Sequence, residues 1–180
     1  SSSAETHIHE LAHRLGKNML VLPQEMNLVD FYQGKYGSAT MPAEYASQLK
    51  ASPLNAHIQS ISSILYGNIH VGGTPVVLAS FDEWESTNDT AFVGSKVAER
   101  LGLRTESPIT LNGVQLKVVD VVESPPDGLD QGIFTSLFTG QQILNRPRAI
   151  NALRLGGCWC QIDVETLARD VERTLPGTRA

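Results

Sequence analysis

The dipeptide Asn112-Gly113 separates two strand-like runs, residues 109–111 and 114–122, and it restricts the local fold more than any other feature of the sequence. A two-residue connection between antiparallel strands needs a positive φ at both central positions, which asparagine and glycine adopt with little strain. The resulting type I′ turn also follows the right-handed twist of the strands that it joins. The sequence therefore predicts an antiparallel β hairpin over residues 109–122.

Short apolar runs bounded by glycine, proline or asparagine predict further strands along the chain. They cover residues 19–22, 58–66, 68–71, 74–81, 133–137 and 149–155. Apolar residues at intervals of three and four predict helices over residues 8–15, 40–49, 92–101, 139–144 and 163–175, whereas residues 24–40 read as an irregular loop. The pattern predicts an α+β fold, in which mixed sheets carry helices packed on one face and an antiparallel hairpin forms a subdomain.

Charge and hydropathy argue against two kinds of partner. A net charge of −5 and the absence of any cluster of lysine and arginine argue against a nucleic-acid-binding surface. The longest apolar runs, residues 75–81 and 118–122, are far too short to cross a bilayer. The sequence begins at Ser1 and shows no signal-peptide pattern, so we expect a processed product or a soluble fragment of a longer protein.

His9, Glu10 and His13 form the pattern H-E-x-x-H, which is typical of zinc hydrolases. In such enzymes two histidines one helical turn apart bind the metal, and the glutamate activates a bound water molecule. Strands of the substrate-binding sheet precede the motif helix in proteases of this kind, but only eight residues precede His9. Both histidines also lie on the flank of the predicted helix, away from its apolar stripe.

A catalytic zinc site also needs a third protein ligand. The extended form of the motif would place this ligand at Met19, and a thioether is a poor ligand for zinc. Glu25 and Glu44 are acidic alternatives, but one is predicted in a loop and the other on a separate helix. We therefore interpret the motif as the polar face of a short helix, and a weak metal site at His9 and His13 stays open.

The two cysteines, Cys158 and Cys160, flank Trp159 after a Gly-Gly pair. This spacing is neither a disulfide framework nor the C-x-x-C of a structural zinc site. In a strand the two sulfurs would share one face with their Cα atoms about 6.6 Å apart, at the outer edge of disulfide geometry. A packing role, a disulfide across a tight bend, and a metal or redox role all stay open.

No other enzyme signature is present in the sequence. It has no phosphate-binding glycine loop, no G-x-S-x-G elbow, and no carboxylate pair placed for acid–base chemistry. Residues 82–89 are interpreted as a solvated acidic loop. We therefore assign no catalytic, cofactor-binding or metal-binding residue and expect no cofactor.

Several segments together resemble the extracytoplasmic domain of ABC transporter permeases of the MacB/FtsX/LolC type. The resemblance is carried by FVGSKVAERLGL at residues 92–103, ITLNG at 109–113, LKVV at 116–119, IFTSL at 133–137 and TGQQIL at 139–144. LGKNMLVL at residues 15–22 is similar to the segment that follows the first membrane helix in that family. The order and spacing of the segments, rather than any one of them, make the case.

The resemblance implies a MacB periplasmic-core-like fold and a role in transport, without chemistry in this domain. The chain would be the large loop between the first two of four membrane helices, on the periplasmic or extracellular side of the cytoplasmic membrane. It implies a cytoplasmic ATP-binding subunit and a second copy of the permease. A partner outside the membrane stays open, and so does its docking place on residues 24–40 or on the β-rich centre. Residues 1–180 would form one domain, with an α/β part at about 5–65 and 124–178 and a β-rich part at about 66–123.

Overall fold

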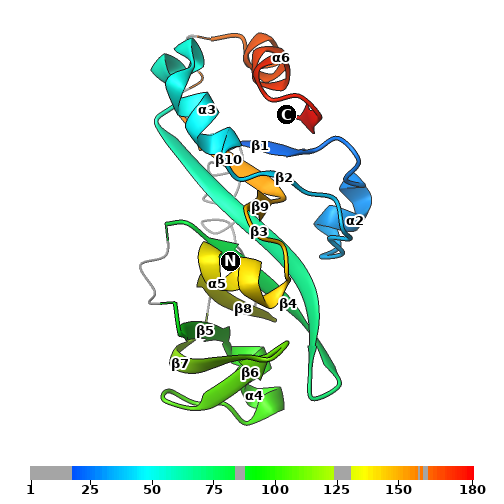
Figure 1. Cartoon of the computed structure of the whole chain (residues 1–180), viewed down its shortest axis with the longest axis vertical. Helices are drawn as coiled ribbons and strands as arrows, with labels where there is room; N and C mark the ends of the chain where they lie inside the picture. Colours follow the sequence, from blue (N-terminus) through cyan, green and yellow to red (C-terminus); the bar gives the residue numbers. More distant parts are fainter. Residues whose placement is uncertain (1–17, 84–87, 124–130, 158, 160–161) are drawn as a thin grey trace, which may run out of the picture.

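A long β hairpin runs through most of the molecule (Figure 1). It consists of β3 (Ser60–Val71) and β4 (Thr74–Phe81), which pair antiparallel from Ile64 opposite Phe81 to Val71 opposite Thr74. Gly72 and Gly73 form its turn with φ values of 56° and 81°, a conformation in which glycine meets no steric penalty. The computed structural model describes residues 18–83, 88–123, 131–157, 159 and 162–180.

The hairpin lies at the centre of a nine-stranded mixed sheet. In order across the sheet the strands are β11 (Thr178–Arg179), β1 (Asn18–Pro23), β10 (Ala152–Gly156), β3, β4, β8 (Gly132–Ser136), β5 (Thr90–Gly94), β7 (Val114–Val122) and β6 (Pro108–Leu111). The pairs β4–β8 and β5–β7 are parallel, and the other neighbours are antiparallel. A separate two-stranded sheet joins β2 (Met41–Pro42) to β9 (Ala149–Ile150).

Helices pack at both ends of the elongated sheet and, in the case of α2 and α5, beside its middle (Figure 1). They are α2 (Leu28–Tyr32), α3 (Tyr45–Ala51), the 3₁₀ helix η1 (Pro53–His57), α4 (Ser95–Leu101), α5 (Leu137–Ile143) and α6 (Val164–Thr174). At one end α3 and α6 pack with β1 and β10 around a core that includes Leu49, Leu153 and Val171. At the other end α4 packs with β5, β6 and β7 around a core that includes Val97 and Val118.

An aromatic cluster fills the space between these two cores. Tyr36 and Tyr66 stack with their ring centroids 4.8 Å apart, and Phe31 meets Tyr66 edge-on at 5.6 Å. Phe81 and Phe134 extend the cluster across β4 and β8, with their ring centroids 6.5 Å apart. The cluster therefore fixes α2 and the following loop against the middle of β3 and β4.

The structure confirms the mixed α+β class and the clearest local prediction. Asn112 and Gly113 adopt φ values of 47° and 84° between β6 and β7, as a type I′ turn requires. Gly102 ends α4 in the left-handed conformation, with a φ of 65°, as expected of a glycine at that position. The two strands predicted over residues 58–71 form a single strand, β3, because Gly67 stays in register opposite Leu78.

Two predicted helices begin later than expected. The helix predicted over residues 40–49 begins at Tyr45, because Met41 and Pro42 pair with β9. The helix predicted over residues 92–101 begins at Ser95, because residues 90–94 form β5 between β7 and β8. In both cases a strand lies just before the helix, so the apolar strand residues extend the helical pattern in the sequence. The helix predicted over residues 8–15 lies outside the described residues.

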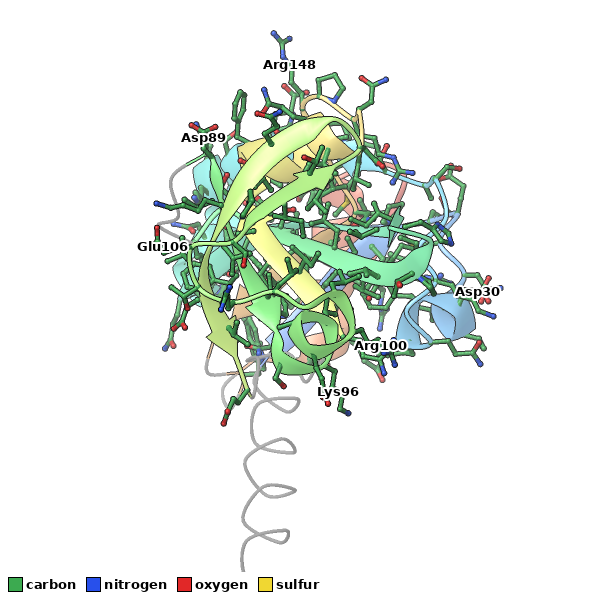
Figure 2. The ribbon with its side chains drawn as sticks, turned by 90° about the horizontal axis from the view of Figure 1, so that it is seen from below. Asp30, Asp89, Lys96, Arg100, Glu106 and Arg148 are labelled. Atoms are coloured by element: carbon green, nitrogen blue, oxygen red, sulfur yellow. The ribbon has the colours of Figure 1, made fainter. Side chains whose placement is uncertain are left out.

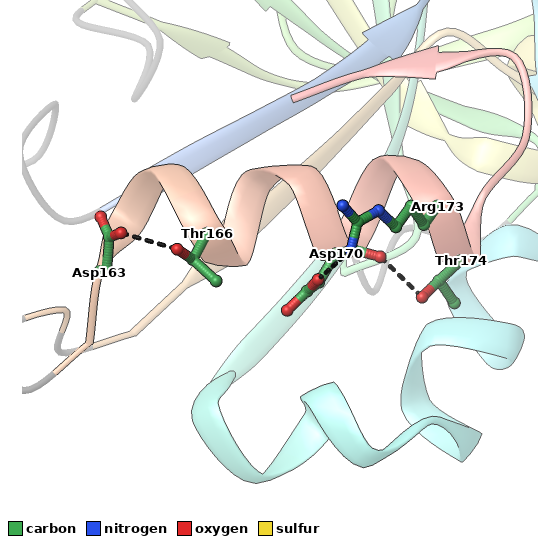
Figure 3. Close-up of polar contacts among 5 residues, drawn as sticks. All are labelled: Asp163, Thr166, Asp170, Arg173 and Thr174. Atoms are coloured by element: carbon green, nitrogen blue, oxygen red, sulfur yellow. Dashed lines mark hydrogen bonds and ion pairs between the residues drawn. The ribbon is translucent and has the colours of Figure 1, made fainter.

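Asp163 caps the start of helix α6, as predicted, and this cap is expected to make the stability of the protein dependent on pH. The Asp163 carboxylate accepts hydrogen bonds from the Thr166 hydroxyl at 2.6 Å and from the Glu165 backbone N–H at 3.2 Å (Figure 3). The Thr166 hydrogen bond holds the pKa of Asp163 below its ordinary value of 3.8. A carboxyl group with a lowered pKa in the folded state stabilises the fold above its unfolded-state pKa, and this stabilisation is lost as the pH falls through the folded-state value.

We therefore expect Asp163→Ala to lower the thermal unfolding midpoint at neutral pH, and this deficit should shrink as the pH falls below 3.8. Thermal unfolding followed by circular dichroism between about pH 6 and pH 3 measures the difference between the two proteins. Asp163→Asn is the control, because its amide oxygen caps the helix but does not ionise in this range. A deficit of Asp163→Ala that is equal at both ends of the range would contradict the role of the charge.

Candidate interaction surface on the α2 segment

The connection between β1 and β2 contains a short helix that the sequence reading missed, since residues 24–40 were expected to be irregular. Asn27 caps α2 by accepting a hydrogen bond from the Asp30 backbone N–H at 3.0 Å. Gly34 follows the helix with a φ of 76° and reverses the chain. An asparagine cap before an apolar turn is the signal that could have located this helix, but five residues are too few to show a helical period.

One face of α2 is anchored in the aromatic cluster. Phe31 is 9% exposed and meets Tyr36 edge-on at 5.5 Å, and it also contacts Tyr66 of β3. The Asn68 side chain accepts a hydrogen bond from the Tyr36 N–H at 2.9 Å and donates one to the Gly34 carbonyl at 2.7 Å. The strand β3 therefore holds the loop that follows α2.

Two arginines from distant parts of the chain hold the ends of the same segment. The Arg179 guanidinium, on β11, donates a hydrogen bond to the Met26 carbonyl just before α2. The Arg146 guanidinium donates to the Gly37 carbonyl at 3.1 Å, close to the start of β2. Because side chains from elsewhere in the chain bond both Met26 and Gly37, the α2 segment is fixed to the rest of the molecule at both of its ends.

The opposite face of α2 is apolar and open to solvent. Leu28, Val29 and Tyr32 are 40%, 65% and 75% exposed. Among the described residues only three other large apolar side chains, Val119, Phe138 and Val164, are exposed, and they lie on three other elements. Contiguous apolar surface of this kind is typical of a binding site, whereas scattered single residues are not.

A pocket of about 420 Å³ lies beside this apolar face. It is lined by Glu25, Met26, Asn27, Asp30, Lys35, Tyr36, Gly37, Ser38 and Ala39. Figure 2 shows Asp30 on the outer side of the molecule, directed away from the sheet. The pocket is therefore open and carries both acidic and basic side chains, and with Leu28, Val29 and Tyr32 it forms what we call the α2 surface.

Of the candidate residues from the sequence, the structure places Glu25 in the lining of this pocket and Glu44 just before α3. His9, Glu10 and His13, together with Cys158 and Cys160, lie outside the described residues. Within the part of the chain that the structure describes, no group of three or more histidine, cysteine, aspartate or glutamate residues is placed to hold a metal ion.

The acidic loop after β4 contains one carboxyl group with a shifted pKa. Partial desolvation raises the pKa of Asp82 above its ordinary value of 3.8, although its carboxylate accepts a hydrogen bond from the Ser63 N–H at 3.0 Å. The neighbouring Glu83 accepts a hydrogen bond from the Ser62 hydroxyl. Both carboxylates thus bind the edge of β3, which is a structural role.

Comparison with known proteins gives matches in structure but not in sequence. No protein-family model matches the chain, and no curated protein matches it. No helix among the described residues is long and apolar enough to cross a membrane.

Two solved structures share the fold over most of its length. The periplasmic region of MacB from Actinobacillus actinomycetemcomitans matches with a TM-score of 0.62 and 10% identity, covering 90% of this chain and 86% of that one. The extracellular domain of the noncanonic ABC-type transporter YknZ from Gram-positive bacteria matches with a TM-score of 0.65 and 10% identity, covering 90% of this chain and 98% of that one. Both neighbours are transporter domains outside the membrane rather than enzymes. The chain therefore has the fold of the extracytoplasmic domains of MacB-type ABC transporters, as its sequence resemblance predicts.

Proposed function

We propose that the chain is the extracytoplasmic domain of an ABC transporter permease, which couples ATP-driven movement of membrane helices to export or to the actuation of a partner outside the membrane. The observation that carries this proposal is the match to two transporter domains over 90% of the chain and nearly all of each neighbour. Independent support comes from the sequence segments that resemble this family, since they occupy β1, α4, the β6–β7 hairpin, β8 and α5 in the family's order.

The proposal also assigns partners and a location. ATP hydrolysis would take place in a separate cytoplasmic ATP-binding subunit, and this domain would perform no catalysis. Two permease copies would place two such domains side by side on the periplasmic or extracellular side of the cytoplasmic membrane. The zinc hydrolase and the metal or redox sensor that the sequence left open gain no support from these neighbours.

In this proposal the domain consists of two parts. We place the α/β part at about residues 5–65 and 124–178 and the β-rich part at about residues 66–123. Separate cores around α3 and α6 and around α4 support this division. Ile133 of β8 and Ile143 of α5 pack into the second core, so these elements would connect the two parts.

The location is tested by labelling a single cysteine in the full-length protein in intact cells. Glu106→Cys, in a Cys158→Ser/Cys160→Ser background, places a thiol at a position whose side chain is 69% exposed. We expect a membrane-impermeant maleimide that crosses only the outer envelope to label it before the cytoplasmic membrane is broken. The background protein without Glu106→Cys is the control, and labelling that appears only after lysis would overturn the proposal.

The function itself is tested in the assembled transporter. Replacing the domain by a short flexible linker in the permease should leave ATP hydrolysis by the cytoplasmic subunit measurable and abolish export or partner activation. A permease that keeps its full cellular activity without the domain would show that the domain does not couple ATP hydrolysis to export or to partner activation.

A further inference from the structure

The α2 surface combines a protruding side chain with a recess in the same short segment. Tyr32 is 75% exposed on α2, and the pocket of about 420 Å³ is lined by residues on both sides of that helix, from Glu25 to Ala39. A twofold contact between identical chains uses the same patch on both, so the patch must offer a projection and a matching recess. The α2 surface offers both.

The charges in the pocket are also self-complementary. Asp30 and Lys35 both line it, as does Glu25. In a twofold contact residue i of one chain meets residue j of the other, and residue j of the first meets residue i of the second. Asp30 and Lys35 would then form two equivalent ion pairs across the axis, which a partner of a single charge sign could not satisfy.

The segment is already held in place before anything binds. Arg179 of β11, Asn68 of β3 and Arg146 of the α5–β9 connection bond its backbone carbonyls, and Phe31 is buried in the aromatic cluster. Binding through such a surface loses little conformational entropy, because the surface does not have to order itself first.

We propose that the α2 surface is a contact between two copies of this chain, in which Tyr32 of each copy enters the pocket of the other and Asp30 faces Lys35. The proposal rests on the proposed function, because a permease dimer is what brings two such domains together. The surface is small, which is typical of transient contacts. Two domains anchored in one dimer reach effective concentrations in the millimolar range, so even a weak contact is then populated.

The first test is self-association of the isolated 180-residue chain, measured by sedimentation velocity over a concentration series. We expect a monomer–dimer equilibrium with a dissociation constant of about 1 mM or tighter, the range that becomes relevant in a tethered dimer. Tyr32→Ala should weaken it at least about tenfold, as expected of an aromatic anchor. Phe138→Ala is the matched control, because it removes an aromatic side chain of similar exposure, 54%, from α5.

The second test reverses charges one chain at a time. Asp30→Lys alone and Lys35→Asp alone should each abolish self-association, whereas a mixture of the two variants should associate about as well as the wild type, since both ion pairs are then restored. The controls are Asp170→Lys and Arg173→Asp on α6, where an aspartate and an arginine form an exposed ion pair of 3.4 Å (Figure 3). Changes at that pair should leave self-association unaffected.

The outcomes separate this inference from the proposed function. A chain that stays monomeric up to about 1 mM, or equal effects of the α2 and α6 charge changes, overturns the α2 contact and leaves the labelling and coupling tests of the permease untouched. Loss of partner binding or of vesicle binding by Tyr32→Ala without any self-association would assign the surface to that other occupant and likewise overturn the contact between copies.

Discussion

Replacing Asn151 with alanine is expected to lower the free energy of unfolding by about 4 kcal/mol, because two buried backbone groups of β3 lose their partners. Asn151 is fully buried between β9 and β10. Its side-chain oxygen accepts a hydrogen bond from the Tyr66 N–H at 2.8 Å, and its side-chain nitrogen donates one to the Tyr66 carbonyl at 2.8 Å. The amide therefore acts as one more residue of strand β10, at the point where the pairing of β10 with β3 ends at Ile64.

Urea unfolding at pH 7 measures this loss, and Asn55→Ala is the control. Asn55 is an exposed asparagine on η1, and its replacement should change stability by less than about 0.5 kcal/mol. Asn151→Asp separates the two hydrogen bonds, because it keeps the acceptor for the Tyr66 N–H and loses the donor to the carbonyl. We expect it to be destabilising as well, since it places in the interior a carboxyl group that has no cation to pair with. An Asn151→Ala protein as stable as Asn55→Ala would show that the side chain does not complete the ladder.

The second large effect is expected at Gly140, where α5 approaches β4 more closely than any side chain would permit. A Cβ atom at Gly140 would lie 1.8 Å from the Ser80 Oγ and 2.4 Å from the Ser80 Cβ. Ser80 is fully buried, and its hydroxyl shares a hydrogen bond of 2.8 Å with the Thr135 hydroxyl of β8. The added methyl group would have to push α5 away from the sheet and disturb this bond, at a cost of about 3 kcal/mol.

The sign of the Gly140→Ala effect makes it a sharp test. In a helix that is free to accept a side chain, glycine to alanine stabilises by roughly 0.5–1 kcal/mol, so a close approach reverses the ordinary outcome. Chemical denaturation of the variant measures the change, and Gly140→Ala combined with Ser80→Gly should recover part of the lost stability by removing the clashing atoms. A stabilised Gly140→Ala protein would contradict the close packing of α5 on β4.

Local chemistry explains which elements could be predicted. The hairpin at Asn112-Gly113 and the cap at Asp163 depend on neighbouring residues alone, and both are confirmed. The predicted starts of α3 and α4 were wrong. The residues before α3 pair with β9, and those before α4 pair with β7 and β8, so both sets form strands. Helix α2 escaped prediction because a five-residue helix has no visible period.

The candidate surface could be predicted only in part. The sequence left open whether a partner would dock on residues 24–40 or on the β-rich centre, and the α2 surface lies in the first of these. It could not show that Phe31 points inward while Val29 and Tyr32 point outward, because this depends on the aromatic cluster contributed by β3 and β4. Nor could it show that Asn151 completes a strand, since Tyr66 is 85 residues away in the sequence.

The unbroken course of β3 gives the fold a mechanical property. Its first residues pair with β10 at the end of the molecule that α3 and α6 cover, and its last residues lead into the turn at the opposite end. Twelve residues in extended conformation span about 40 Å, and the pairing with β4 continues through Gly67 without a bulge. A tilt of about 5° at the β10 end would thus displace the β3–β4 turn by about 3.5 Å over that length. Because the strand is stiff, a small rotation at its β10 end becomes a displacement of several ångströms at the β3–β4 turn.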